Sequence, residues 1–297
     1  MKNTGFANRL FDVLNFALLA LFTLCILLPF YYMFVLSVSD PVAVGMYQTT
    51  VIPKGLNFVS YTTVFQDNQI VQAYWNSILY TVTGTLLALV FGCLTAYPLS
   101  VARFRARKIL TIMFTATMFF SGGLIPTFMV IRNLGMLDTI WAVTLPGAFT
   151  FWNIIILRTN FQMMPSAIIE SAHIDGANDW RILYQIVIPL SKAILATIGL
   201  FASVGLWNAY FAPLIYLTSP EKQTLTLILR RILISNEVFS QDAMDTSTVL
   251  DNPMSLLGKM VSLRMATIFV TIGPIVLIYP FVQKYFVRGV LIGSVKG

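Results

Sequence analysis

The side chains best suited to chemistry lie in one polar, charged segment, from Glu170 to Pro189, of an otherwise apolar chain. The segment holds three carboxylates, two aromatic residues and the only histidine of the chain, His173. One imidazole without a cysteine or a second histidine beside it makes no metal site, and no nucleophile–histidine–acid set is recognisable. A lone histidine in a loop is more often incidental than a pH switch. The pattern favours recognition over catalysis.

Two short helices are predicted to position these side chains. Pro165 can open the first helix, and Gly176 interrupts it, because glycine permits backbone conformations that other residues resist. Asp175 is expected to cap a second helix, over 178–185, and this places Trp180 and Tyr184 on one face. Such a helical pair suits a groove on another protein. A plain amphipathic helix–turn–helix loop without a partner is the alternative.

Composition sets the class of protein around this segment. Of 297 residues, 57% are hydrophobic and 10% are charged, against about 25% charged in soluble domains. The charges are clustered and leave six long charge-free intervals, each long enough for the ~20 apolar residues that cross a bilayer as a helix. These intervals are 12–40, 67–103, 108–132, 138–158, 192–221 and 264–284. The sequence therefore predicts an all-α integral membrane protein with six transmembrane helices.

The first of these intervals is predicted to be a retained anchor. It is longer than the apolar region of a signal peptide, and no small-residue cleavage site follows it. Cys25 and Cys93 both fall inside predicted spans, so they are expected to be packing residues without a disulfide or metal role.

The distribution of Lys and Arg predicts the orientation of the chain. With six spans, both termini share one side with the connections 103–108 and 158–192. Twelve of the nineteen basic residues lie on that side and seven on the other, whereas the acidic residues divide four to eight. The net charge of +7 thus separates into +8 and −1, and both termini are predicted to be cytoplasmic. The basic balance is a sign of topology, and nucleic-acid binding is disfavoured.

Several small residues and helix breakers mark the predicted spans. Gly84, Ala88, Gly92 and Ala96 form a smooth ridge on the second span, which favours close packing within the chain over a subunit interface. Residues 121–126, Ser-Gly-Gly-Leu-Ile-Pro, and the pair Pro146-Gly147 loosen the third and fourth spans. Backbone groups freed at membrane depth need polar or watery neighbours. Such breaks favour a protein that moves or lines a cavity.

No source of energy for transport is evident in the chain itself. The spans contain no acidic or basic residue in their interiors, which disfavours an ion-driven secondary carrier, although carbonyl-based ion sites stay open. A phosphate-binding loop is also missing, because Gly258-Lys259 is followed by Met260 and lacks the preceding glycine. If the protein moves a solute uphill, another subunit must supply the energy.

The segment from Glu170 to Pro189 resembles the E-A-A loop of ABC-importer permeases. Similar stretches cover nearly the whole chain: F-S-G-G-L-I-P (120–126), L-G-M-L-D-T-I-W-A (134–142), I-P-L-S-K-A (188–193), V-G-L-W-N-A-Y-F (204–211) and R-G-V-L-I-G-S-V-K-G (288–297). The chain is similar to the smaller permease of the maltose-type carbohydrate uptake group, in the branch for complex or acidic oligosaccharides such as alginate. Ser171 in place of the middle Ala and Ile188 in place of Leu are slight departures that should not disable docking.

The resemblance implies a type I ABC-importer permease fold and a coupling role for this loop. Its coupling residues would dock in a cleft of an ATP-binding subunit, and closure of two such subunits would switch the cavity between cytoplasm-facing and outside-facing states. Glu170 would form a charge-assisted bond to a basic residue of that subunit. The coupling residues implied are Glu170, Ser171, Ala172, Asp175, Gly176, Ala177, Ile186 and Pro189.

The resemblance also implies a set of partners. These are a second related permease, two ATP-binding subunits that carry ATP and Mg²⁺, an extracytoplasmic solute-binding protein and membrane lipid. The chain itself would carry no cofactor and no catalytic site. Arg230 and Arg231, in the external loop, would contact the solute-binding protein.

Residues that could contact a sugar in the passage are aromatic or carry an amide. Trp207, Asn208 and Tyr210 lie about 27–32 Å along the helix from the coupling loop, near the outer mouth. Trp152 and Asn153 of the fourth span could face the same cavity. An aromatic belt at the membrane interface is the alternative for Trp207.

These observations predict a multi-pass permease of a bacterial cytoplasmic (inner) membrane that imports an oligosaccharide by alternating access. The expected organisation is a cytoplasmic N-terminus (1–12), a six-helix domain (13–288) and a cytoplasmic tail (289–297). The domain includes a coupling loop (159–192) and an extracytoplasmic loop (219–262). A secondary carrier and a non-transporting membrane scaffold are the alternatives.

Overall fold

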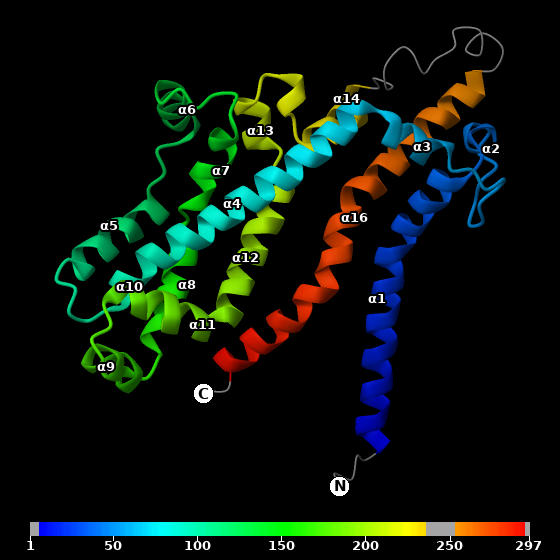
Figure 1. Ribbon diagram of the computed structural model, residues 1–297. Coiled ribbons are helices and arrows are strands. Elements are labelled where there is room, and N and C mark those ends of the chain that lie inside the picture. Colours follow the sequence, from blue (N-terminus) through cyan, green and yellow to red (C-terminus); the bar gives the residue numbers. More distant parts are fainter. Residues whose placement is uncertain (1–5, 236–252, 295–297) are drawn as a thin grey trace. The chain divides into compact units, whose positions relative to one another are not determined.

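The computed structural model describes residues 6–235 and 253–294, and the regular elements in these ranges are helices (Figure 1). Parts of the predicted N-terminus (1–5), external loop (236–252) and tail (295–297) lie outside the described residues. The chain forms two compact units, one made of residues up to Asn68 with 229–272, the other of residues 69–228 with those from Gly273 onward.

The helices are bounded as follows: α1 (Phe6–Val38), α2 (Pro41–Gly45), α3 (Val59–Gln66), α4 (Asn68–Ser100), α5 (Arg107–Phe119), α6 (Leu124–Asn133), α7 (Ile140–Ala148), α8 (Phe151–Gln162), α9 (Ser166–Ile174), α10 (Asp179–Ile182), a π-helical turn (Leu183–Val187), α11 (Ile188–Leu190), α12 (Lys192–Trp207), α13 (Phe211–Tyr216), a 3₁₀ turn (Pro220–Lys222), α14 (Leu225–Ser235) and α16 (Pro253–Ser294).

The described residues contain up to six candidate membrane spans. Three helical stretches are long and apolar enough by themselves, namely 8–38, 68–100 and 254–274. Three bent pairs of helices supply the others: α5 with α6 at 117°, α7 with α8 at 46°, and residues 179–190 with α12 at 82°. The bends between α5 and α6 and between α7 and α8 fall at or next to the predicted weak points, 121–126 and Pro146-Gly147.

The ridge of small residues on α4 packs inside the second unit, as the sequence favoured. All four of its residues are buried. A Cβ atom added at Gly84 would lie 2.6 Å from Cδ1 of Leu206 in α12, and one at Gly92 would lie 3.0 Å from Cδ1 of Leu157 in α8. The small residues of the ridge therefore let leucine side chains of α8 and α12 pack closely against α4.

The main core of the second unit surrounds the C-terminal half of α4. Ala96 and Leu99 of α4, Ile154 and Leu157 of α8 and Ile198 of α12 are fully or almost fully buried there. Figure 1 shows α9, α10 and α11 at this end of α4, whereas α6, the start of α7 and α13 lie on the opposite side of this unit. The core thus positions two separate sets of loops and short helices.

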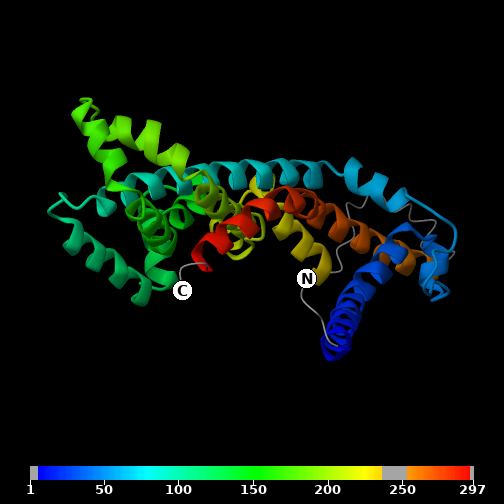
Figure 2. The ribbon, with the colours of Figure 1, turned by 90° about the horizontal axis from the view of Figure 1, so that it is seen from below.

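The first unit is held together where α2 meets the beginning of α16. A Cβ atom at Gly45 would lie 1.8 Å from the Met254 carbonyl oxygen, and one at Gly258 would lie 1.7 Å from that of Pro41. The N-terminal part of α1 projects away from α2, α3 and this part of α16 (Figures 1 and 2). None of the apolar window of α1 is buried within the chain.

Candidate docking surface

The first helix of the predicted coupling loop is α9, and it ends in a glycine turn. The Gly176 N–H donates to the His173 carbonyl (3.0 Å) and the Ala177 N–H donates to the Ala172 carbonyl (2.9 Å), which is the Schellman pattern. Gly176 has φ +77°, in the left-handed region that suits glycine. The two alanines that bracket the cap both pack on the main core. The small residues of this motif therefore turn the chain sharply over a buried base.

The second helix of the loop, α10, begins about one turn later than it would if Asp175 were its N-cap. Asn178 caps α10, because its side-chain oxygen accepts a hydrogen bond from the Arg181 N–H (2.9 Å). Asp175 instead forms the exposed C-cap of α9. The prediction that Asp175 caps the second helix is therefore wrong: the glycine turn uses Asp175 to close the first helix, and the next helix begins after it.

Pro189 determines the backbone conformation of the residues that follow α10. Pro189 has no N–H to donate and its ring crowds the carbonyl of the residue four positions before it, so a regular α-helix cannot pass. Residues Leu183–Val187 form a π-helical turn instead, and the Ile188 N–H donates to the Leu183 carbonyl. Ile186 lies half-buried against the main core, whereas Pro189 is exposed.

The loop has a buried side and an exposed side. Ala172, Ile182 and Val187 are buried in the main core. On the opposite side, large apolar residues remain open: Ile174 is 87% exposed, Tyr184 75% and Trp180 69%. Glu170, Ser171 and Asp175 are exposed as well. We call the exposed residues Glu170, Ser171, Ile174, Asp175, Trp180 and Tyr184 the docking surface. An apolar, partly acidic surface on a rigid base is suited to binding another protein.

Polar contacts tie this surface to the ends of α4 and α8. Asp179, in the first turn of α10, forms an ion pair with Arg103 and accepts a hydrogen bond from the Tyr97 hydroxyl (3.3 Å). Ser191 donates to the side-chain oxygen of Asn160 in α8 (3.0 Å). These contacts join the loop directly to the cytoplasmic ends predicted for α4 and α8.

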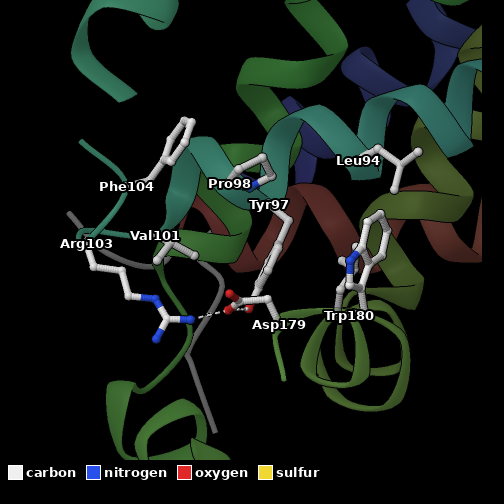
Figure 3. Close-up of a pocket in the computed structure, with 9 residues that line it drawn as sticks. Leu94, Tyr97, Pro98, Val101, Arg103, Phe104, Asp179 and Trp180 are labelled. Atoms are coloured by element: carbon white, nitrogen blue, oxygen red, sulfur yellow. Dashed lines mark hydrogen bonds and ion pairs between the residues drawn. The ribbon is translucent and has the colours of Figure 1, made fainter. Parts of the chain in front are cut away.

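A groove with a volume of about 460 Å³ lies beside these contacts (Figure 3). Its walls come from the last turns of α4, the turn that follows them, α10 and the start of the π-helical turn. Figure 3 shows Tyr97 pointing from α4 towards Asp179, with Arg103 reaching the same carboxylate and the Trp180 indole below Leu94. Most of the lining is apolar, with one ion pair at its edge.

A second polar cluster lies at the other end of the second unit, around Asp138. Its carboxylate accepts hydrogen bonds from the Thr218 N–H (3.0 Å), the Ser219 N–H (3.0 Å) and hydroxyl (2.6 Å), and the Lys222 ammonium (2.9 Å). The bonds from Ser219, followed by that from Lys222, hold the pKa of Asp138 well below its ordinary value. Asp138 has φ +58°, a conformation that aspartate tolerates better than most residues. This carboxylate fixes the chain between α13 and α14 to the start of α7.

The residues predicted to contact a sugar lie at and after the end of α12 and near the start of α8. Trp207 ends α12 and is buried, with its ring edge-on to that of Tyr74 at 5.9 Å between centroids. Asn208 and Tyr210 follow in an exposed turn. Trp152 is exposed and Asn153 half-buried near the start of α8.

The two arginines predicted to face a binding protein lie on α14. Arg230 and Arg231 are both half-buried, and each has an interaction partner. Their contact with a separate protein stays a prediction.

Sequence comparison connects this architecture to a known family. Residues 88–292 match the family described as binding-protein-dependent transport system inner membrane component. The chain belongs to this family. It is a permease subunit of an ABC transporter and is not itself catalytic. The predicted resemblance, the all-helical membrane fold and the location in the inner membrane are thereby confirmed.

Individual relatives resemble the permease over nearly its whole length. The polygalacturonan/rhamnogalacturonan transport system permease protein YtcP of Bacillus subtilis is 38% identical over 98% of this chain and 99% of its own. An inner membrane ABC transporter permease protein, YcjP of Escherichia coli, is 29% identical over 94% of each chain. A crystal structure of a bacterial ABC transporter involved in the import of the acidic polysaccharide alginate contains a chain with a TM-score of 0.87 and 34% identity, covering 96% of this chain and 100% of that one.

The structural roles of Asn178, Asp138 and Asp179 were not predicted from the sequence. Asn178 could have been found, because asparagine is a preferred N-cap and Gly176 is typical of the end of the preceding helix. The partners of Asp138 and Asp179 had no local signal, since both contacts join segments about 80 residues apart in the chain.

Proposed function

We propose that the permease pairs with a second, related permease and imports an acidic oligosaccharide by alternating access. Two ATP-binding subunits, which carry the ATP and Mg²⁺, bind to the two permeases. The docking surface is the observation that carries this proposal: Ile174, Trp180 and Tyr184 are exposed apolar side chains on a base that is buried in the core. A water-soluble partner that covers them removes a large apolar area from water.

The contacts at α10 support a mechanical route from the ATPase to the membrane helices. When the ATP-binding subunits close, the docked α9 and α10 move together, because a four-residue turn (175–178) with two backbone hydrogen bonds joins them. The Asp179 contacts with Tyr97 and Arg103 carry this motion to the end of α4. Rigid-body motion of packed helices then switches the passage between its two openings.

The exposure of helix α1 supports the proposal that a second permease is present. Its apolar window is long enough to cross a bilayer, yet none of it is buried within this chain. Lipid covers part of such a helix, and a related permease is proposed to cover the rest. By this proposal the translocation path runs between the two permeases, so Trp152, Asn153, Trp207, Asn208 and Tyr210 would contribute only a part of its lining.

The names of similar proteins support the proposal that the substrate is acidic. One is named for polygalacturonan and rhamnogalacturonan, and a similar solved transporter imports alginate, an acidic polysaccharide. We propose that an extracytoplasmic binding protein delivers an oligosaccharide rich in uronic acids. Arg230 and Arg231 on α14 would then contact the edge of the surface that this binding protein presents to the permease.

Uptake by the complete transporter in proteoliposomes tests the proposal. We expect ATP enclosed with the ATP-binding subunits to drive accumulation of oligogalacturonate in the presence of the binding protein, with neutral oligosaccharides of equal length as the control substrate. Uptake that follows an imposed ion gradient without ATP would favour a secondary carrier. Partner binding without any accumulation would favour a scaffold. Equal uptake of neutral and acidic oligosaccharides would contradict the substrate class only.

A further inference from the structure

We propose that the groove between the end of α4 and α10 is a binding site for one anionic phospholipid. The acyl chain would lie along the apolar wall and the phosphate at the basic turn that follows α4. This inference concerns a lipid ligand and does not depend on the proposed substrate or on the ATPase partners.

The depth of the groove in the membrane matches a lipid. Leu94 and Pro98 line one wall on the last turns of α4, a candidate membrane span, and Val101 continues this wall just after the helix ends. From Leu94 to the end of α4 is about 9 Å at ~1.5 Å per residue. The groove therefore extends from the apolar interior to the level where the first charged residue, Arg103, appears. Headgroups and the first part of the acyl chains occupy this depth.

The wall residues also match an acyl chain. Phe104 and Leu183 add to the apolar lining, and the Trp180 indole stands at the edge with most of its surface open (Figure 3). The open part of Trp180 belongs to the docking surface, so the lipid would contact only the part of the indole that lines the groove. A water-filled groove of this composition would leave apolar surface exposed at membrane depth.

The turn that follows α4 is basic. Arg103, which lines the groove, is offset by Asp179, but Arg105 directly follows the groove residue Phe104, and Arg107 and Lys108 come next in the chain. These three form no salt bridge in the part of the chain that the structure describes. Basic pockets on the cytoplasmic side of membrane helices bind anionic headgroups, and the predicted topology puts this turn on the cytoplasmic side. An anionic headgroup would be attracted to these cations, whereas a neutral one would not.

Lipid retention by the assembled transporter tests this proposal. The complex is purified in mild detergent with an equal mixture of phosphatidylglycerol and phosphatidylcholine, and the bound lipids are counted by mass spectrometry. Leu94→Trp should fill the groove and remove about one phosphatidylglycerol per permease, in line with a single headgroup site. The matched control is Val90→Trp, one turn earlier on α4 and similarly exposed, which should retain that lipid.

A second pair of variants keeps the test valid if the first impairs folding. Arg105→Gln with Lys108→Gln should weaken phosphatidylglycerol binding by about 30-fold, since each basic residue near an anionic lipid contributes about a fivefold factor. Lys54→Gln with Arg132→Gln removes two exposed charges on the other predicted side and should change nothing. Equal retention of both lipids by the wild type, or unchanged retention in both groove variants, would overturn the proposal. So would a photo-crosslinker at position 94 that reacts with a partner protein instead of a lipid.

Discussion

Glu170 is an exposed carboxylate on α9, two residues before the buried Ala172. The buried base beneath it fixes where α9 presents this residue, so a basic residue of the ATP-binding subunit is proposed to pair with the carboxylate. We expect Glu170→Ala to abolish ATP-dependent uptake while the chain still reaches the membrane. Loss of one partner of a buried, charge-assisted pair costs about 2–5 kcal/mol of binding free energy. Uptake in proteoliposomes and the amount of ATPase that co-purifies measure the two effects.

The control for this variant is Asp12→Ala, which removes an exposed carboxylate on the same predicted side of the membrane but outside the docking surface. It should transport normally. If Glu170→Ala transports as well as Asp12→Ala, the coupling role of Glu170 is wrong, whatever the substrate is.

Asp138 contributes to stability through its ionised form. Its pKa is lowered in the folded protein, so the stabilisation is complete above the unfolded value of about 4 and is lost as the pH falls through the folded value. We expect Asp138→Asn to lower the free energy of unfolding at pH 7 by about 1.5–3 kcal/mol, because it weakens hydrogen bonds to a charged group. The difference from the wild type should shrink as the pH falls below 4. Melting temperatures of the two proteins in detergent, taken from pH 7 to the lowest pH at which the fold survives, check this.

Glu221→Gln is the matched control for Asp138→Asn, since Glu221 is an exposed carboxylate at the same end of the unit. Its melting temperature should follow the wild type at every pH. A constant difference between Asp138→Asn and the wild type across this range would mean that the side-chain shape, and not the charge, matters.

Single residues were predictable from the sequence only where the signal was local. Gly176 was recognised as a break because glycine suits a left-handed turn, and the structure has it at φ +77°. Asp138 was noticed only as a charge between two spans, because its partners, near residue 220, come about 80 positions later. The error over Asp175 had a local cause, since aspartate can both begin and follow a helix.

At the scale of elements, the contact between α2 and α16 depends on two glycines that face each other's backbone. A Cβ atom at Gly258 would lie 1.7 Å from the Pro41 carbonyl oxygen, so the two helices would have to separate. We expect Gly258→Ala to destabilise the first unit by about 1–3 kcal/mol, as overpacking does. Thermal unfolding in detergent measures this. Gly273→Ala, in the same helix with no atom within 4 Å of the added Cβ, should have little effect; equal effects would indicate a helix-wide cause instead of the close approach.

The link between α4 and α10 is expected to act in coupling more than in stability. Both side chains of the Arg103–Asp179 pair are more than half exposed, and exposed pairs contribute about 0–1 kcal/mol. Arg103→Asp should therefore leave the melting temperature nearly unchanged but lower the uptake obtained per ATP hydrolysed. Combining Arg103→Asp with Asp179→Arg should recover part of that ratio. If the double variant transports no better than the single one, the pair does not carry the motion.

Elements were predictable where composition alone defines them. Six charge-free intervals correspond to up to six candidate spans, because a helix is the structure that satisfies its own backbone in lipid. The angles were not predictable: residues 121–126 indicated a weak point, but the 117° bend between α5 and α6 depends on packing that no local pattern encodes. The π-helical turn before Pro189 was predictable only in part, since proline predicts an interruption of the α-helix but not the form that it takes.

At the scale of the whole molecule, the distribution of charge must agree with the place of the docking surface. The predicted cytoplasmic side carries +8 and the other side −1, and ATP-binding subunits are available only in the cytoplasm. In a chain with Cys25→Ala and Cys93→Ala, we expect Thr50→Cys to react with a membrane-impermeant thiol reagent in intact spheroplasts. Ser166→Cys, at the start of α9, should react only after the membrane is opened. Both positions are exposed, so burial does not explain a difference. Reaction of Ser166→Cys in intact spheroplasts would place the docking surface on the outside and remove the ATP-driven mechanism, together with the cytoplasmic placement of the lipid groove.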